Sequence, residues 1–412
     1  MSHQGPVLVV SPDGRPALSD ILCDRFSFLI VDATCERAAA AFVEHRPAAI
    51  VFDFSERCAE NLIELASVVR DCEIYTPVIS VGAQTLPPEN VLVCDVTDDT
   101  EFNRLAARLT AALRVRTLHE TVQRRQSETT LPSRPEGDPL QDATALLVGR
   151  SATYPALSVA TGQRVGVVGA LSIEAAARHL NVRDIDGIIL GEGFSARMTD
   201  AFLTVLTEDA RFRNLPVVIA SSAGNAKFTH DLANLEIAQG SADEIVAIAL
   251  PLIRQHALEA RLGRRLKSLD AGGLLDPRTG LLTNDAFDRT FAKTVSQSLE
   301  TGSGFSAARF VFDGVEPRAL FDAARILSRL MRKMDFASLR EDGSIVAAFA
   351  ETELRKAHVI ARRLASVLKH TMLSDGDRSA IDPQVTLATL RHIDSVESFL
   401  GRLRYTEQRQ AS

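Results

Sequence analysis

The sequence lacks several features that would place it in a common functional class at once. It has no run of about 18 consecutive apolar residues, so we expect no membrane-spanning helix. The first residues show neither a basic region nor a long apolar stretch, so we expect no secretory signal peptide. The net charge is −7 over 412 residues, which disfavours general nucleic-acid binding. These absences predict a cytoplasmic, water-soluble protein.

The usual spacings of catalytic and metal-binding residues are also absent. The nine histidines show no H-E-x-x-H spacing, and there is no phosphate-binding loop or nucleophilic triad. No pair of cysteines has the C-x-x-C spacing, and we expect all of them to be reduced and most to be buried. No cofactor is predicted to be required. The five cysteines are Cys23, Cys35, Cys58, Cys72 and Cys94.

The residues that are present show one pattern of strands and helices twice. Each copy has five short apolar runs, separated by stretches long enough for a crossover helix. Such runs are typical of strands buried on both faces of a parallel sheet. In the first copy, residues 1–125, the runs are 6–10, 28–31, 49–52, 77–81 and 91–94, and a helix follows near 101–124.

The second copy, residues 143–270, follows a polar, proline-containing segment at 126–142 that we predict to be a linker. Both copies are predicted to have the same fold class, a doubly wound, flavodoxin-like α/β sheet. The strand candidates of the second copy are 145–148, 165–168, 187–190, 216–220 and 235–237, and a long helix is expected near 242–269.

The remainder, residues 271–412, has a different pattern, which predicts an α+β domain. Asp342-Gly343 is a strong turn signal between two short apolar runs and predicts a hairpin. Helices are expected at 283–299, 317–333, 351–368 and 396–405, and strands at 307–312, 336–339, 345–349 and 384–387.

The first α/β domain resembles the receiver domains of response regulators. Asp53 directly follows the third apolar run, and functional groups in such sheets gather at the carboxyl ends of strands. The resemblance implies that Asp53 is a phosphoacceptor in a phosphorelay, with Mg²⁺ held after the first strand, where Asp13 is the remaining carboxylate. It also implies a hydroxyl residue after the fourth strand and a lysine after the fifth. Gly82 stands at the first of these positions, and residues 94–97 contain no lysine.

The second α/β domain departs further from the receiver pattern. Gly149-Arg150 replaces the acidic pair after its first strand, and Gly191 stands at the position of the acceptor. It therefore resembles a pseudo-receiver. A structural role is expected for it, either in packing, in binding a partner or in forming a homodimer through the receiver domains.

The third domain resembles GGDEF diguanylate cyclase domains. The segment 276–287 matches their D-x-L-T-G-L-x-N-R-x-x-F motif at Asp276, at Thr279-Gly280-Leu281 and at Phe287. In the place of the catalytic signature stands Glu341-Asp342-Gly343-Ser344-Ile345, without the two glycines or the acidic pair. Asp313 is the one metal-binding aspartate left, and a two-metal phosphoryl transfer needs several oxygen ligands. We therefore predict that the domain has no catalytic residues and no cyclase activity.

The resemblance also implies a nucleotide-binding site that is separate from the catalytic one. Active GGDEF domains often bind their product, cyclic di-GMP, at an R-x-x-D motif, and Arg332 and Asp335 stand at the corresponding offset. Arg363 takes the place of a further arginine on the next helix. The competing interpretation is a surface ion pair, which would contribute at most about 1 kcal/mol. The same tetrapeptide pattern also occurs at Arg183…Asp186, Arg197…Asp200 and Arg391…Asp394.

The order of domains resembles the receiver–receiver–GGDEF response regulators of two-component signalling, of the PleD type. Within that family, members with a decayed catalytic slot imply a cyclic-di-GMP effector. Such effectors act as adaptors for protease-delivery components in cell-cycle control, recruited to a cell pole. The alternative hypothesis is a phosphorylation-driven adaptor that uses Asp53 and binds no nucleotide.

Overall fold

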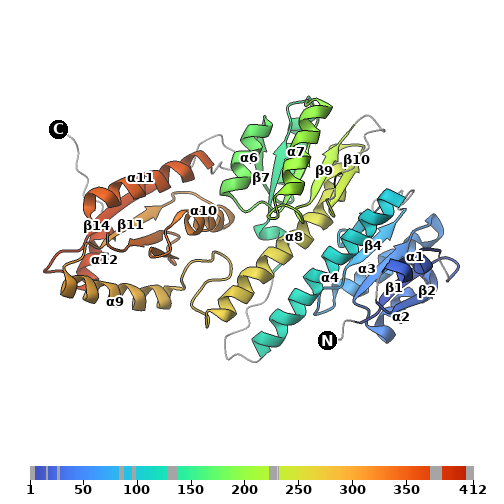
Figure 1. The fold of residues 1–412 in the computed structure, drawn as a ribbon, viewed down its shortest axis with the longest axis horizontal. Coiled ribbons are helices and arrows are strands. Elements are labelled where there is room, and N and C mark those ends of the chain that lie inside the picture. The colour runs from blue at the N-terminus through green and yellow to red at the C-terminus, as the bar shows by residue number, and fades with distance from the viewer. Residues whose placement is uncertain are drawn as a thin grey trace. The chain divides into compact units, whose positions relative to one another are not determined.

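The computed structural model describes residues 5–14, 17–25, 28–82, 88–94, 99–127, 137–221, 230, 232–371 and 383–404 (Figure 1). The chain divides into two compact units. Unit 1 consists of Met1–Ala177 and Ile185–Leu262, and unit 2 consists of Arg178–Asp184 and Gly263–Ser412. In the described part of the chain, no helix is both long and apolar enough to span a membrane.

The first sheet of unit 1 is parallel throughout and has the strand order β2-β1-β3-β4-β5. This order is that of flavodoxin-like sheets, in which functional groups gather at the carboxyl ends of the strands. Its strands are β1 (Val7–Ser11), β2 (Ile30–Thr34), β3 (Ala49–Asp53), β4 (Val78–Val81) and β5 (Val91–Cys94). Its helices are α1 (Ala17–Arg25), η1 (Cys35–Arg37), α2 (Ala38–His45), η2 (Glu56–Cys58), α3 (Ala59–Arg70) and α4 (Asp99–Ser127).

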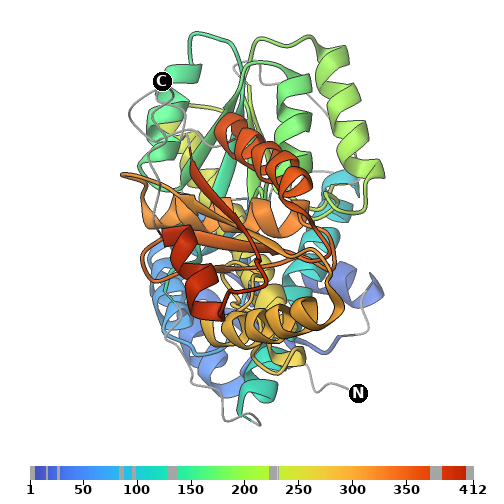
Figure 2. The same ribbon diagram turned by 90° about the vertical axis from the view of Figure 1, so that its left-hand side faces the viewer.

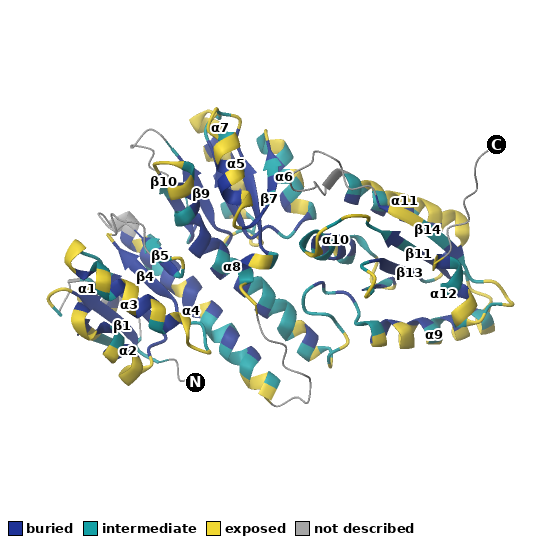
Figure 3. Cartoon of the chain, turned by 180° about the vertical axis from the view of Figure 1, so that it is seen from behind, coloured by how far each residue is buried: buried dark blue, intermediate teal, exposed yellow. Residues whose placement is uncertain are grey.

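The second sheet of unit 1 repeats this topology, with the order β10-β9-β8-β6-β7 and parallel pairing throughout. Its strands are almost entirely buried, because helices cover both faces (Figure 3). The strands are β6 (Thr144–Val148), β7 (Gly166–Ala170), β8 (Gly187–Leu190), β9 (Val217–Ala220) and β10 (Leu235–Ala238). The helices are η3 (Pro139–Asp142), α5 (Tyr154–Gly162), α6 (Ile173–Val182), α7 (Ala196–Glu208) and α8 (Ala242–Asp270).

Unit 2 contains an antiparallel sheet with the order β12-β13-β11-β14. Helices α10 and α11 cover one face of this sheet, while α9 and α12 cover the other (Figures 1 and 2). Its strands are β11 (Ser306–Val311), β12 (Phe336–Leu339), β13 (Ile345–Phe349) and β14 (Gln384–Thr389). Its helices are α9 (Asn284–Thr301), α10 (Pro317–Leu330), α11 (Leu354–Thr371) and α12 (Val396–Arg404).

The predicted fold class is confirmed, since two five-stranded parallel sheets precede an α+β domain. Two helix ends differ from expectation for a backbone reason. The helix expected to reach residue 333 ends at Leu330, because Met331 is extended, with φ −73° and ψ 153°. The helix expected from residue 351 begins at Leu354, because Glu351 has a φ of 49°, which a right-handed helix excludes. As a result, the segment from Arg332 to Asp335 forms a turn between α10 and β12.

A fully buried arginine joins the two sheets of unit 1. Arg108, on α4, donates to the Glu236 carboxylate at 2.6 Å and to the carbonyl oxygen of Leu235 at 3.2 Å. It also donates to the carbonyl oxygens of Ala233, at 3.3 Å, and of Val93. A buried charge is tolerated only where it is paired and hydrogen-bonded. Arg108 meets this condition through β5 and the segment that contains β10.

Replacing Arg108 with alanine would leave Glu236 largely buried without its counter-charge. We expect Arg108→Ala to lower the free energy of unfolding by about 3–5 kcal/mol, measured by urea denaturation. Arg114→Ala is the matched control, because Arg114 lies on the same helix and is exposed. The control should change the free energy by less than about 0.5 kcal/mol. Equal effects of the two substitutions would contradict the role given to Arg108.

Candidate functional site

The carboxyl edge of the first sheet brings together the two aspartates predicted there. Asp53 is the last residue of β3, and Asp13 follows β1. Burial raises the pKa of the Asp53 carboxyl, and the negative charge of Asp13 raises it further. A residue that sequence reasoning missed is Ser11, whose Oγ is buried and has no hydrogen-bond partner among the described residues. Its position at the end of β1 was the available signal.

The two carboxylates, Asp13 and Asp53, could hold a Mg²⁺ ion that keeps most of its water ligands, but they are too few to enclose an ion. Mg²⁺ in proteins often keeps several waters and takes one or two carboxylates. Among the described residues, no group of three or more His, Cys, Asp or Glu side chains is arranged to hold a metal. Gly82 has open space around its Cα and offers no hydroxyl group. In receiver domains a lysine follows the fifth strand. The corresponding residues here, 94–97, contain no lysine and lie mainly outside the described residues. Phosphorylation of Asp53 therefore stays a prediction.

The expectation that all cysteines are reduced is wrong for one pair. Cys35 and Cys58 form a disulfide, with their Cα atoms 5.9 Å apart, while the other three cysteines are free. Cys35 directly follows β2, and Cys58 ends the short helix after β3. The pairing escaped the sequence analysis because 23 positions separate the two residues, and only the fold brings them together.

The carboxyl edge of the second sheet is closed by other side chains. The Arg150 guanidinium donates through Nε to the carbonyl oxygen of Gly193 at 2.7 Å and lies over the Phe194 ring. A Cβ atom at Gly149 would lie 3.2 Å from the Tyr154 ring, so glycine makes room for that ring. The positions of the acidic pair thus serve packing in this domain.

In unit 2, the residues at the predicted place of the catalytic signature form the hairpin turn between β12 and β13. The Asp342 carboxylate accepts hydrogen bonds from the Ser344 amide at 2.9 Å, from the Ser344 hydroxyl at 2.6 Å and from Arg309 at 2.8 Å. Although burial raises the pKa of Asp342, these partners hold it below its usual value. Asp313 accepts a hydrogen bond from the Gln384 amide at 2.9 Å.

Asp335 carries the least satisfied polar group of the candidate site. Its residue exposure is 8%, and its Oδ1 atom is buried with no hydrogen-bond partner among the described residues. Burial raises the pKa of the Asp335 carboxyl, although the backbone N–H groups of Arg332 and Ala350 and the charge of Arg332 oppose that shift. A buried polar atom left unpaired costs about 1–3 kcal/mol. Such an atom calls for a physical explanation, and a bound ligand is one.

The other two predicted site residues, Arg332 and Arg363, also belong to unit 2. Arg332 belongs to the same turn as Asp335, and Arg363 lies on α11, which packs with α10 against one hydrophobic cluster. Both side chains are exposed, and neither guanidinium group forms a hydrogen bond or ion pair with a described residue. The guanidinium groups of Arg332 and Arg363 are therefore available to a ligand, in the same domain as the unsatisfied carboxylate of Asp335.

The other three R-x-x-D motifs have satisfied aspartates. Asp186 accepts a hydrogen bond from the Thr144 amide at 2.9 Å and lies 3.4 Å from His256. Asp200 is exposed and lies 3.4 Å from His230. Asp394 is half-buried, and its two oxygens accept from the Arg391 amide at 2.7 Å, from the Ser398 hydroxyl at 3.3 Å and from Arg402. The structure thus separates Asp335 from three identical sequence patterns.

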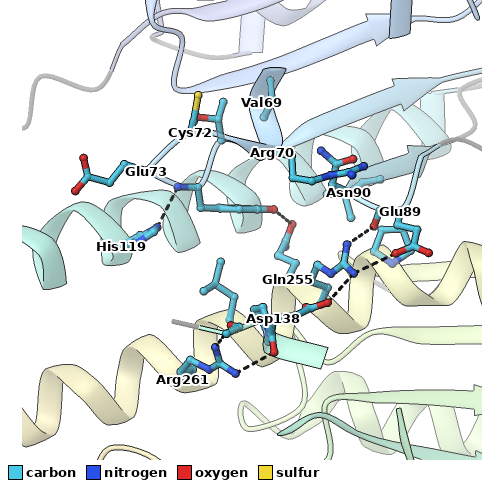
Figure 4. A pocket seen from close by; sticks show the side chains of 18 residues that line it. Val69, Arg70, Cys72, Glu73, Glu89, Asn90, His119, Asp138, Gln255 and Arg261 are labelled. Carbon is cyan, nitrogen blue, oxygen red and sulfur yellow. Dashed lines mark hydrogen bonds and ion pairs between the residues drawn. The ribbon is translucent and has the colours of Figure 1, made fainter. Parts of the chain in front are cut away.

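A cavity of about 550 Å³ in unit 1 is a second candidate site (Figure 4). Several of its charged groups are paired within the chain. Arg254 contacts Glu89 at 3.3 Å and Asp138 at 3.2 Å. The Tyr75 hydroxyl donates to the Gln255 amide oxygen at 2.9 Å. These contacts join segments of unit 1 that are far apart in the sequence, although Arg254 Nε and Asn90 Oδ1 are buried without a partner among the described residues.

Comparisons with known proteins give matches among solved structures alone. No protein-family model matches the chain, and no curated protein does. The coiled-coil and GGDEF domains of DgcB from Caulobacter crescentus, in complex with c-di-GMP, are 15% identical, with a TM-score of 0.31, over 35% of this chain and 83% of that one. The FimX GGDEF domain from Pseudomonas aeruginosa is 17% identical, with a TM-score of 0.29, over 32% and 89% of the two chains.

A third similar structure is the active GGEEF domain of a diguanylate cyclase from Vibrio cholerae. It is 11% identical, with a TM-score of 0.28, and covers 30% of this chain and 86% of that one. The chain thus combines two parallel five-stranded α/β sheets with a C-terminal part that is similar to GGDEF domains. The assignment of a ligand rests on the residues of this chain.

Removing the charge of Asp13 should lower the pKa of Asp53. Because burial is the larger cause of the raised pKa, Asp13→Asn should return it only partway toward the ordinary value of about 3.9. The pH dependence of the Asp53 carboxyl ¹³C shift measures this change. An unchanged titration in Asp13→Asn would show that the two carboxylates do not interact.

Asp335 should reduce stability when it is ionised. Its raised pKa means that the folded state holds the proton more tightly than the unfolded state, so the ionised group destabilises the fold as pH rises through the folded pKa. We expect Asp335→Asn to raise the free energy of unfolding at neutral pH, with the gain disappearing in acid near the unfolded value of about 3.9. Urea denaturation at several pH values tests this expectation. Asp394→Asn, as control, should lower stability, because it weakens the contact with Arg402.

Proposed function

We propose that the chain is a cyclic-di-GMP-binding effector without diguanylate cyclase activity. The observation that carries the proposal is the buried, unpartnered Oδ1 atom of Asp335, in one domain with the unpaired guanidinium groups of Arg332 and Arg363. A guanine dinucleotide supplies what these groups lack. Its guanine N–H edge donates to a carboxylate, and its phosphates and the guanine O6 and N7 atoms accept from arginine forks.

Binding requires a small local change at the turn. The Oδ1 atom of Asp335 is buried, but Arg332, Lys333 and Met334 beside it are exposed. Rotation of the carboxylate toward the surface would bring this oxygen to a guanine N–H donor and remove the cost of leaving it unpaired. The ligand would then favour one arrangement of the turn over the others, which is the thermodynamic requirement for a receptor.

The hairpin turn at the predicted place of the catalytic signature supports the second half of the proposal. Asp342 is held by Ser344 and Arg309, and Ile345 is buried in the sheet core. Metal-assisted phosphoryl transfer needs free carboxylates at fixed spacing around two ions. The Asp342 carboxylate accepts hydrogen bonds within the turn, and the Asp313 carboxylate accepts one from Gln384. We therefore infer that the domain binds a nucleotide and does not synthesise one.

The proposed effect of ligand binding on a protein partner follows from the resemblance of the domain order to adaptor-type response regulators. Ligand binding at unit 2 would change the surface offered to a protein partner, by a coupling free energy between two sites. By the same resemblance, the partners are protease-delivery components in cell-cycle control, and the protein acts in the cytoplasm at a cell pole. No residue pattern of the described chain identifies these partners.

A phosphorylation-driven adaptor is the second candidate function. The raised pKa of Asp53 and the closeness of Asp13 favour it, because paired carboxylates at a strand end can hold a hydrated cation. Under this alternative, Asp53→Asn would change partner binding and cyclic di-GMP would not bind. Under the proposed function, Asp53→Asn would leave ligand binding unchanged.

Calorimetric titration with cyclic di-GMP tests the proposed function. We expect Arg332→Ala and Arg363→Ala each to weaken binding by about 1–3 kcal/mol, roughly 5- to 150-fold in Kd, because each removes a charged fork. Arg391→Ala is the matched control, because Arg391 belongs to an R-x-x-D motif whose aspartate is already satisfied. It should leave the Kd unchanged.

Three outcomes would contradict the proposal. Absence of binding in the wild type would leave the phosphorylation-driven adaptor as the better hypothesis. Weakening by Arg391→Ala that equals that by Arg332→Ala would show that the ligand binds elsewhere. Turnover of GTP in the presence of Mg²⁺ would contradict the loss of cyclase activity.

A further inference from the structure

The disulfide between Cys35 and Cys58 lies beside the segment that carries Asp53. Cys35 begins η1, which leads from β2 into α2, and Cys58 ends η2, which leads from β3 into α3. Asp53, at the end of β3, is five positions before Cys58. The bond therefore joins the two connections that leave the carboxyl edge of the first sheet on either side of β1.

The surroundings of the pair are apolar, with one polar neighbour. Both cysteines belong to the hydrophobic cluster under α2 and α3, at 1% and 4% exposure. The Ser55 hydroxyl donates to the Cys58 sulfur at 3.3 Å. Two residues next to Cys58, Glu56 and Arg57, are exposed. The short helix η2 that carries Cys58 is thus exposed at two of its three residues.

The other three cysteines form no disulfide in the structure. Cys23 and Cys72 are exposed and free, and Cys94 is buried and free. A permanent structural bridge is most useful in a small domain that cannot build a sufficient core. The first α/β domain has a full core on both faces of its sheet. Stability therefore gives little reason for a bridge at this place.

We infer that Cys35 and Cys58 are a reversible thiol–disulfide modification site that fixes the connection between Asp53 and α3. Hydrogen peroxide is the oxidant by chemical class, because it is small enough to reach a nearly buried sulfur. One thiol is oxidised to a sulfenic acid while peroxide is reduced to water, and the second thiol displaces hydroxide as water to form the disulfide. A dithiol reverses the step by exchange, returning both thiols and becoming a disulfide itself.

The consequence concerns the loop, independently of the cyclic-di-GMP site in unit 2. In the disulfide state, the segment from Asp53 to Cys58 is tied at one end by β3 and at the other by the bond to Cys35. In the dithiol state, the second tie is gone, and the loop beside the candidate phosphoacceptor gains freedom. The redox state of the pair would thereby set how firmly Asp53 and its surroundings are held.

Counting alkylatable thiols in the full chain tests the inference. After treatment with dithiothreitol and its removal, denatured protein should show five thiols, and after a few equivalents of hydrogen peroxide it should show three. Mass spectrometry should find the peptides of Cys35 and Cys58 linked. The oxidised protein should also show slower hydrogen exchange at residues 54–58 and a higher Tm.

Matched variants separate this site from the exposed thiols. Cys23→Ser and Cys72→Ser should keep the loss of two thiols, the exchange difference and the Tm difference. Cys35→Ser and Cys58→Ser should abolish all three, and the wild-type measurement stands even if one of these variants folds poorly. Five thiols after peroxide would overturn the inference. So would a bond that resists excess dithiothreitol in the folded protein, since it would then be a permanent bridge.

Discussion

A carboxylate oxygen that is buried without a hydrogen-bond partner is expensive, and the functional interpretation of this chain depends on one such atom. Oδ1 of Asp335 has no partner among the described residues, while the backbone around it belongs to a well-packed turn and strand. Such an atom lowers the stability of the fold unless a ligand supplies the missing hydrogen bond. Asp335 and the two free arginines Arg332 and Arg363 together match the donors and acceptors of one guanine dinucleotide.

Three other charged side chains, one of them fully buried, have hydrogen-bond partners within the chain, and the Oδ1 atom of Asp335 differs from them. Arg108 is fully buried, yet its guanidinium is paired with Glu236 and with three carbonyl oxygens. Asp394, in an identical R-x-x-D pattern, has both of its oxygens satisfied. Asp342, in the hairpin turn, is exposed, and its carboxylate still accepts three hydrogen bonds. Each of these three charged groups therefore has hydrogen-bond partners within the chain, whereas the Oδ1 atom of Asp335 has none among the described residues.

The fold followed from the sequence because strand burial and hydrophobic period are local signals, and β5, β8, β12 and β13 have the expected bounds. The end of α10 did not follow, because Met331 turns extended where the apolar period continues toward the site. The partners of Asp335 and the bond between Cys35 and Cys58 depend on residues far apart in the sequence. A single sequence contains no signal for such long-range contacts. The candidate residues could therefore be predicted from the sequence, but which of the aspartates lacks a hydrogen-bond partner could not.

The most direct test of the central claim is the response of individual aspartates to the ligand. In protein labelled with ¹³C at the aspartate carboxyls, cyclic di-GMP should shift the resonance of Asp335, because its oxygen gains a donor, and should leave that of Asp394 in place. A shift at Asp394 with none at Asp335, or no shift at either at saturating ligand, would contradict the claim that this turn is the nucleotide site.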